Sequence, residues 1–198
     1  MKQRIAITGG IGSGKSTLVK LIQESGFPVY SCDEIYQTII STSAYVKQIE
    51  KIFPSAVQKN RIDKNVLAQI VFNDDAAREI LNNVAHPLIM QELSKRMNDS
   101  EGEMVFAEVP LLFEENLENA FDLVIVIMRT EAKRIQSVLT RDKSSVEQVR
   151  KRIRAQADYQ SPSISERIKD CNAFVIDNNG DVAQLKEQWL AFLHKHKH

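Results

Sequence analysis

The sequence GGIGSGKST, residues 9–17, is the stretch that decides the fold of this chain. It fits the pattern G-x-x-x-x-G-K-[ST] at every fixed position. The residues before it, 5–8, read as a short buried strand, and Leu18, Leu21 and Ile22 recur after it at helical spacing. A strand, a glycine-rich turn and a helix in this order are typical of a P-loop, which binds nucleotide phosphates.

The residue types in this stretch suit a bound nucleoside triphosphate with magnesium. Glycines let backbone N–H groups wrap around a phosphate, and the N-terminus of the helix adds a positive partial charge. Lys15 is expected to reach the β- and γ-phosphates, and the Ser16 hydroxyl to bind Mg²⁺. An accidental glycine-rich turn is the alternative, and the complete pattern argues against it. The residues expected to bind ATP here are Gly9, Gly10, Ile11, Gly12, Ser13, Gly14, Lys15, Ser16 and Thr17.

The rest of the chain alternates apolar runs with helical patterns. Strands are predicted at 27–30, 104–109, 123–128 and 173–176, and helices at 131–141, from 144 to about 156, and around 182–192. Residues 144–147, Ser-Ser-Val-Glu, offer a capping box. The segment 34–98 reads as almost wholly helical, with N-caps at Asp63 and Asp74 and breaks at Pro54 and Pro87. This order predicts an α/β P-loop NTPase fold, a parallel sheet flanked by helices.

The domain organisation follows from where the strands lie. We expect one P-loop kinase domain over 1–198, with a core of about 1–31, 103–135 and 165–198. A helical acceptor-binding insertion is expected at about 32–100, and a lid at about 137–160, where a basic run surrounds Arg141. Such a run is usually a solvated helix face; a P-loop in the same chain favours a phosphate-covering lid.

Composition narrows the classes of function. Lys and Arg together number 26, and Asp and Glu together also number 26, so the chain has no basic excess. The basic run also lacks aromatic residues, and both features disfavour a nucleic-acid partner. The N-terminal apolar run is too short for a signal peptide, and the longest apolar run, 123–128, is too short for a membrane helix. Two cysteines without metal or redox spacing suit a cytoplasmic location. The tail residues His194, His196 and His198 read as a solvated terminus.

The P-loop alone leaves several classes of protein open. A guanine-nucleotide switch usually carries Asn-Lys-x-Asp, which is absent from this sequence. A motor ATPase usually needs a larger chain than 198 residues. The short length, the helical insertion and the basic hairpin therefore favour a kinase of small metabolites. Rivals are a shikimate- or nucleotide-type kinase and a non-enzymatic ATP-binding regulator; glycine is too sparse for the second glycine-rich triplet of a shikimate kinase.

Beyond the P-loop, the sequence resembles the dephospho-CoA kinase family over nearly its whole length. The resemblance rests on the P-loop, the strand ending at Asp33, and the segments 78–89 (REILNNVAHPLI), 110–114 (PLLFE) and 175–178 (VIDN), with Arg141, Gln156 and Arg167 in matching places. It implies ATP and Mg²⁺ as cofactors and dephospho-CoA as the substrate, phosphorylated at the ribose 3′-hydroxyl; no obligate protein partner is implied. Ser31 stands where the family usually has Asp, and Ser137 where it often has Arg.

Positions along the chain, together with the resemblance, suggest roles for individual residues. Asp33 is expected to be the general base, with a helix-capping role as its alternative, and Arg141 to be the lid arginine over the phosphates. Glu108 is a candidate for contact with a magnesium-bound water, or a structural carboxylate. Asp177 and Asn178 are candidates for the adenine loop, or an Asx turn. The candidates for the acceptor side, each with packing or solvation as its alternative, are Arg78, His86, Pro110, Leu112 and Phe113.

Overall fold

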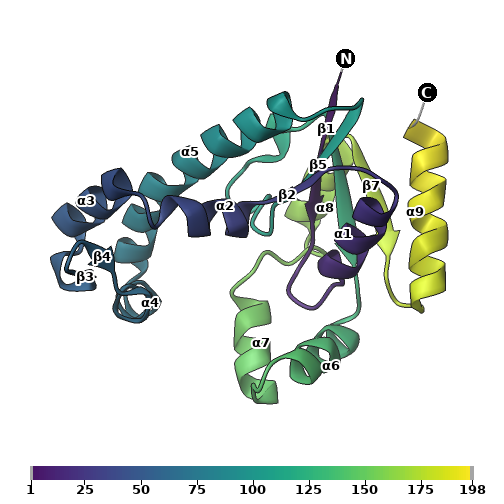
Figure 1. Cartoon of the computed structure of the whole chain (residues 1–198). Coiled ribbons are helices and arrows are strands. Elements are labelled where there is room, and N and C mark those ends of the chain that lie inside the picture. The colour runs from purple at the N-terminus through teal and green to yellow at the C-terminus, as the bar shows by residue number, and fades with distance from the viewer. Residues whose placement is uncertain (1, 197–198) are drawn as a thin grey trace. The chain divides into compact units, whose positions relative to one another are not determined.

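The chain divides into two compact units, each with its own hydrophobic core. In the computed structural model, which describes residues 2–196, the first unit comprises Met1–Val29 and Ser100–His198, and the second Tyr30–Asp99. The first unit carries the sheet and the P-loop, and the second is mainly helical (Figure 1).

The sheet has five strands in the order β2-β5-β1-β6-β7. β1 pairs in parallel with both β5 and β6, and β6 pairs in parallel with β7. The α/β architecture predicted from the sequence is therefore confirmed. Because parallel strands end at the same edge, the segments after β1, β6 and β7 gather there. The strands are β1 (Gln3–Thr8), β2 (Val29–Ser31), β5 (Met104–Glu108), β6 (Leu123–Met128) and β7 (Ala173–Asp177).

The core of the first unit lies where α1 (Lys15–Glu24) and α9 (Val182–His196) pack on the sheet. Alternate strand residues face these helices, because successive side chains of a strand point to opposite faces. The buried residues of this core include Ile5, Ile7, Phe106, Ile125 and Ile127 from the strands and Leu18, Ile22, Trp189 and Phe192 from the helices. Three more helices complete the unit: α6 (Glu131–Arg141), α7 (Val146–Arg154) and α8 (Pro162–Asp170).

The second unit packs four helices around a separate core. They are α2 (Cys32–Ile39), α3 (Ser43–Ile52), α4 (Lys64–Asn73) and α5 (Asp75–Asp99). Their shared apolar residues include Tyr45, Ile49, Phe53, Leu67 and Leu81. Burial raises the pKa of Tyr45 above its usual range, with the Tyr36 hydroxyl adding to the shift. Asp63 caps α4 and the Asp74 carboxylate accepts a hydrogen bond from the Ala77 N–H, so both predicted N-caps are confirmed.

Several local predictions were wrong. Pro87 lies inside α5 and does not break it, because Leu81 and Ala85 before it and Leu93 after it are all buried. The capping box is one residue later than predicted, with Ser145 and Gln148 as its members. Helix α9 continues to His196, whose ring stacks on Phe192 with centroids 4.7 Å apart, so the solvated terminus predicted at His196 is wrong. His194 is exposed, as predicted, and His198 lies outside the described residues.

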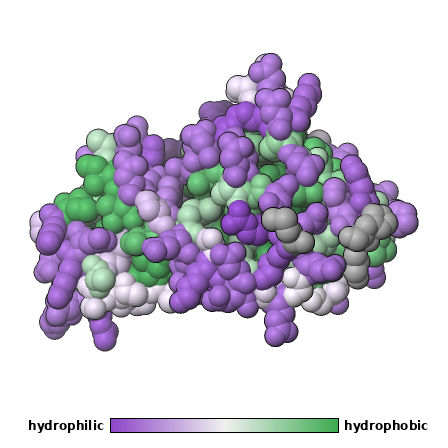
Figure 2. All heavy atoms as spheres, turned by 90° about the horizontal axis from the view of Figure 1, so that it is seen from above, coloured by the Kyte–Doolittle hydropathy of each residue, from purple (hydrophilic) through white to green (hydrophobic). Residues whose placement is uncertain are grey.

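Several short elements were not predicted. A hairpin of β3 (Val57–Gln58) and β4 (Arg61–Ile62) interrupts the helical second unit. The helix α8 and the 3₁₀ turns at Pro54–Ala56 and Glu118–Ala120 were also missed. Hydrophilic side chains predominate on the face in Figure 2, with smaller hydrophobic areas between them. Among the described residues, none of the helices is both long and apolar enough to cross a membrane.

Candidate active site

The P-loop connects the end of β1 to the start of α1 through glycines in a left-handed backbone conformation. Gly12 has φ of 75° and Gly14 has φ of 104°. A Cβ added at Gly12 would overlap the carbonyl group of Arg134, and one at Gly14 would overlap the side-chain amide of Asn178. Glycine is therefore required at both positions, for the backbone conformation and for the close approach of neighbouring groups.

The carbonyl groups of this loop are held by side chains from three directions. Lys15 Nζ donates to the Gly9 carbonyl at 2.7 Å, and Asn178 Nδ2 donates to the Ser13 carbonyl at 2.7 Å. Two arginines that follow β6 hold the middle of the loop. Arg134 Nε donates to the Ile11 carbonyl at 2.9 Å, and Arg129 Nη1 donates to the Gly12 carbonyl at 3.3 Å.

This bracing determines where the backbone amides point. In a trans peptide the C=O and the next N–H are directed to opposite sides. Because side chains hold the Ile11 and Ser13 carbonyls on one side, the N–H groups of Gly12 and Gly14 point to the opposite side. The first N–H groups of α1 add to these donors, because they have no acceptor within the helix. The loop is thus arranged to accept an anion such as a phosphate.

A cavity of about 410 Å³ lies beside the P-loop within the first unit. Its wall includes Gly10, Ser13, Arg129, Arg134, Gln156 and Tyr159. Gln156 Oε1 accepts a hydrogen bond from the Ile11 N–H at 2.6 Å, and the Tyr159 hydroxyl lies 3.0 Å from Thr8 Oγ1. Burial raises the pKa of Tyr159 to about 12, so this hydroxyl stays protonated at neutral pH. The segment after α7 is therefore tied to the P-loop and to β1.

The residues of the P-loop suit a nucleotide with magnesium. Ser16 is exposed in the first turn of α1, next to the half-buried Lys15, as the motif requires. Among residues 2–196, the structure contains no group of three or more His, Cys, Asp or Glu side chains placed to hold a metal. A cluster of three such side chains is not required in a P-loop site, where the loop hydroxyl, one or two carboxylates and the bound phosphates usually hold magnesium.

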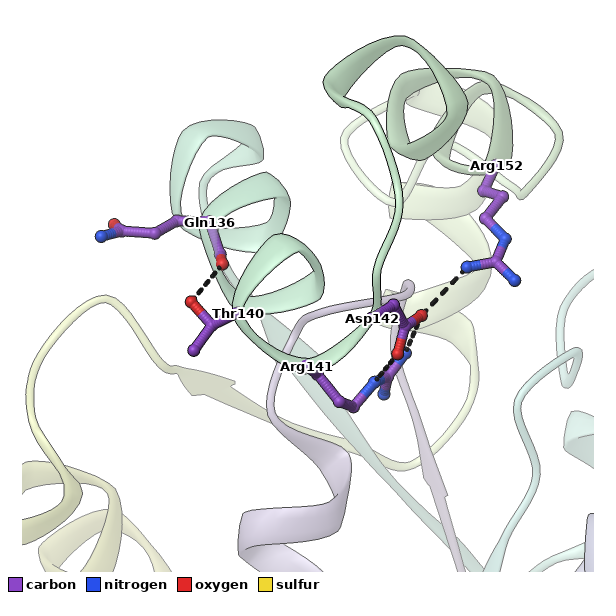
Figure 3. Close-up of polar contacts among 5 residues, drawn as sticks. All are labelled: Gln136, Thr140, Arg141, Asp142 and Arg152. Carbon is purple, nitrogen blue, oxygen red and sulfur yellow. Dashed lines mark hydrogen bonds and ion pairs between the residues drawn. The ribbon is translucent and has the colours of Figure 1, made fainter.

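The predicted lid arginine makes a different set of contacts (Figure 3). Arg141 Nε donates to Asp142 Oδ1 at 2.8 Å, and Arg152 Nη1 from α7 donates to Asp142 Oδ2 at 3.1 Å. The hydrogen bonds that Arg141 donates to Asp142 lower the pKa of Asp142 and raise the pKa of Arg141. Arg141 does not line the cavity described above. Its side chain is 59% exposed, so this arginine is accessible to a ligand.

Asp33 occupies the first turn of α2 in the second unit, where it is exposed. The N-cap of α2 is Ser31, whose hydroxyl accepts a hydrogen bond from the Glu34 N–H at 3.4 Å. The capping role considered as the alternative for Asp33 is therefore wrong, because Ser31 fills it.

The candidates around the end of β5 are mostly buried. Leu112 and Phe113 are at most 1% exposed, and the Phe113 ring contacts Tyr159 with centroids 5.9 Å apart. Arg167 donates to the Phe113 carbonyl at 2.8 Å and lies over its ring. Pro110 is half-buried, and Glu108 ends β5 next to Ile7 of β1. These contacts give Leu112 and Phe113 a packing role, and a role in acceptor binding stays a prediction.

The remaining candidates are divided between the two units. In α5 of the second unit, Arg78 forms an ion pair with Asp75 at 2.9 Å, and His86 is half-buried. In the first unit, Asp177 Oδ1 accepts hydrogen bonds from the backbone and side chain of Asn179, which is an Asx turn. Asn178 is 7% exposed and holds the P-loop. Contacts of these four residues with ligands stay predictions.

Sequence reasoning missed Arg129 and gave Arg134 no separate role. Arg129 follows β6 directly, and its Nη1 also donates to Ser137 Oγ at 2.7 Å. Two features of the sequence could have indicated Arg129. It directly follows a buried strand, and a serine stands at position 137, where an arginine is common.

Comparisons with known proteins show the family of the chain. A family model described as "Dephospho-CoA kinase" matches residues 3–184. Two curated proteins named dephospho-CoA kinase, from Campylobacter jejuni and Carboxydothermus hydrogenoformans, are each 32% identical to the chain. The first alignment covers 95% of this chain and 94% of the relative, and the second covers 98% and 94%.

Solved structures give the same result. The crystal structure of TT1252 from Thermus thermophilus matches with a TM-score of 0.83 and 31% identity, covering 98% of each chain. The dephospho-CoA kinase from Campylobacter jejuni matches with a TM-score of 0.69 and 30% identity, covering 98% of this chain and 97% of that one. A sugar kinase from Janibacter, 13% identical with a TM-score of 0.52, shares the fold. With a family model that spans nearly the whole chain and relatives above 30% identity, the chain belongs to the dephospho-CoA kinase family.

Proposed function

We propose that this chain transfers the γ-phosphoryl group of ATP to the ribose 3′-hydroxyl of dephospho-CoA, giving coenzyme A and ADP. The observation that carries the proposal is a complete, braced P-loop in a chain that belongs to the dephospho-CoA kinase family over residues 3–184. In the reaction, the 3′-oxygen forms a bond to the γ-phosphorus and the bond to the β–γ bridging oxygen breaks. The hydroxyl proton leaves with a base.

The P-loop supplies the binding and electrostatic part of this reaction. Lys15 follows the loop at the start of α1, and its ammonium offsets negative charge on the transferred group. The amides of Gly12 and Gly14 bind phosphate oxygens. The Ser16 hydroxyl would hold Mg²⁺, and Glu108 would hydrogen-bond to a water molecule near it. When bound, the ion would supply positive charge that offsets the negative charge of the phosphates.

The lid and the second unit supply the remaining roles in this proposal. Arg141 exchanges Asp142 for the phosphates when substrates bind, which excludes water from the site. Arg78 and His86 bind the acceptor, and Asp177 with Asn178 borders the adenine. Asp33 accepts the hydrogen bond of the 3′-hydroxyl. Because the transition state of phosphoryl transfer is loose, orientation of the oxygen matters more than the strength of the base.

An ADP-release assay over a panel of acceptors tests the function. The panel is dephospho-CoA, adenosine, AMP and shikimate, each with ATP and magnesium. ADP release that depends on dephospho-CoA, with coenzyme A as the product, is the expected result. Release with AMP or shikimate alone would assign the chain to a different small-metabolite kinase. ATP binding without acceptor-dependent release would favour a regulator.

Asp33→Asn tests the role of Asp33 separately. We expect folding and ATP binding to be kept, and kcat to fall about 10²–10⁴-fold, the usual scale for a positioned acid or base. Ser31→Ala is the matched control two residues away, because it removes the N-cap of α2. It should cost about 0.5–1 kcal/mol of stability and leave kcat nearly unchanged. Near-native turnover by Asp33→Asn would leave the base unidentified.

A further inference from the structure

Gln156 joins the end of α7 to the P-loop. Its Oε1 accepts a hydrogen bond from the Ile11 N–H at 2.6 Å, and its side chain is half-buried. It is the first residue after Ala155, the C-cap of α7. The other side chains described above hold carbonyl groups of the loop, whereas Gln156 holds a backbone N–H. A neutral oxygen carried by the end of a helix therefore fixes one amide of the loop.

The segment that carries Gln156 is fixed to the core on its C-terminal side. The Ala157 N–H donates to Glu114 Oε1 at 2.9 Å. Tyr159 is buried, and its ring packs on that of Phe113. On the N-terminal side lies α7, whose basic residues are exposed. Gln156 thus stands at the boundary between an anchored segment and a helix of the proposed lid.

The peptide group between Gly10 and Ile11 is held at both of its polar ends. Its N–H donates to Gln156. Its carbonyl, that of Gly10, accepts from the Ser13 N–H at 3.1 Å and from Lys15 Nζ at 3.4 Å. The C=O and N–H of a trans peptide are directed to opposite sides. Gln156 and the Lys15 ammonium therefore lie on opposite sides of the same peptide group.

This arrangement gives Gln156 an indirect influence on the reacting atoms. Because it lies on the side away from the Lys15 ammonium, it is not placed to contact the transferred phosphoryl group. It sets the rotation of the Gly10–Ile11 peptide, and with it the direction of a carbonyl that Lys15 Nζ contacts. Without Gln156 the Ile11 N–H would lose its acceptor, and the peptide could rotate toward another one.

We propose that Gln156 is a positioning residue of the kinase reaction, which holds the Gly10–Ile11 peptide so that the Lys15 ammonium is directed at the transferred phosphoryl group. The proposal deepens the proposed function and rests on it. A misdirected ammonium stabilises the transition state less, because that is where charge on the transferred group changes. Turnover should therefore depend on Gln156 more strongly than binding of ATP does.

The test uses three substitutions that separate the length of this side chain from its acceptor. Gln156→Glu keeps an oxygen at the same distance, Gln156→Asn keeps the amide but is one methylene shorter, and Gln156→Met has no oxygen. Steady-state kinetics with ATP and dephospho-CoA measures each variant. We expect Gln156→Asn and Gln156→Met to lower kcat about 10- to 50-fold, the scale of a buried donor left unsatisfied, and to change the KM for ATP less than about threefold. Gln136→Met, at an exposed position of α6, is the control.

Recovery by the carboxylate separates positioning from packing. Gln156→Glu should keep kcat within about threefold of the unmodified protein, because its oxygen can accept the same N–H. Near-native kcat in the Asn and Met variants overturns the proposal, and so does an equal loss of kcat in all three. Thermal unfolding identifies a folding defect. If Gln156→Met does not fold, the comparison of Gln156→Asn with Gln156→Glu decides.

A double-mutant cycle tests whether Gln156 acts through Lys15. Added to Lys15→Ala, Gln156→Asn should slow a single turnover less than about twofold further, because the group that it positions is already gone. The full further loss would show an independent effect and overturn the proposal.

Hydrogen exchange of the Ile11 amide tests the contact without any substrate. Exchange should be faster in Gln156→Asn than in Gln156→Glu, and equal rates would overturn the proposal whatever the reaction is. An unmodified protein with no ADP release that depends on dephospho-CoA would instead overturn the proposed function, so the two failures are distinguishable.

Discussion

Two pairs of arginines in the first unit differ in how they are held. Arg129 and Arg134 are half-buried, and both donate to carbonyl groups of the P-loop. Arg141 and Arg152 are 59% and 54% exposed, and they share the carboxylate of Asp142 (Figure 3). Arg129 directly follows β6 and Arg134 lies in α6, whereas Arg141 ends α6 and Arg152 lies in α7.

The difference in burial indicates different roles for the two pairs of arginines. A half-buried guanidinium that holds backbone carbonyls fixes a geometry, because losing its acceptors would leave buried donors unsatisfied. An exposed ion pair is worth little and is screened by salt, so it can exchange partners at low cost. We therefore expect the P-loop pair to position the nucleotide and the exposed pair to respond to it. The four predictions below follow from this contrast.

The largest effect is expected at the P-loop lysine. Lys15→Ala removes the ammonium that offsets charge on the transferred group and also frees the carbonyls of Gly9 and Gly10. We expect kcat to fall by about 10³-fold or more, with the fold retained. Steady-state kinetics with a circular dichroism control measures both. Near-native activity would remove the P-loop from the reaction.

The next effect concerns the exposed pair. Arg141→Ala should lower kcat roughly 10²-fold, with a smaller change in the KM for the acceptor, if this arginine stabilises charge in the transition state. Limited proteolysis of residues 141–156 should slow when nucleotide is bound to the unmodified protein. Lys169→Met, an exposed change on α8, is the control. Equal cleavage with and without nucleotide would contradict a lid that closes.

A smaller effect is expected for the other P-loop arginine. Arg129→Ala releases the Gly12 carbonyl and leaves Ser137 without its donor. Because this loosens the loop and does not remove a contact to one phosphate, ATP and ADP should both bind roughly 10-fold more weakly. Titration calorimetry with the two nucleotides measures this. A loss confined to ATP would show that Arg129 also binds the γ-phosphate.

Much of the fold and the centre of the site could be predicted from the sequence, because their signals are local. The P-loop is a contiguous motif, and the strands are continuous apolar runs. The hairpin β3–β4 escaped because its strands have two residues each and its turn uses Lys59 and Asn60, with φ of 49° and 57°, in place of a glycine. Pro87 was misread because burial on both sides of it outweighs the local cost of a proline in a helix.

The roles of Arg129 and Arg134 could not be predicted, because they depend on which strands are neighbours. The residues after β6 meet the P-loop because β6 pairs with β1, a contact between positions more than 100 residues apart. In the sequence Arg134 is one cation in a basic run, and nothing in that run indicates that its side chain is half-buried. Asp33 and Ser31 show a similar ambiguity: either can cap a helix, and the structure assigns the cap to Ser31.

The smallest expected effect tests whether burial or charge makes the acceptor of an arginine important. Ser137 is a neutral acceptor for the half-buried Arg129, at 2.7 Å, and Asp142 is a charged acceptor for two exposed arginines. Charge alone predicts that Asp142 matters more. Burial predicts the reverse. Ser137→Ala removes one acceptor from the Arg129 guanidinium, whose Nε already has no acceptor among the described residues.

We expect Ser137→Ala to weaken ATP binding about 3- to 10-fold and to lower stability by about 1 kcal/mol. Asp142→Asn should change the ATP dissociation constant less than about twofold and Tm by no more than about 1–2 °C. Calorimetry and thermal unfolding at low and high salt measure both variants, and the opposite order of effects would show that charge, and not burial, separates the two pairs.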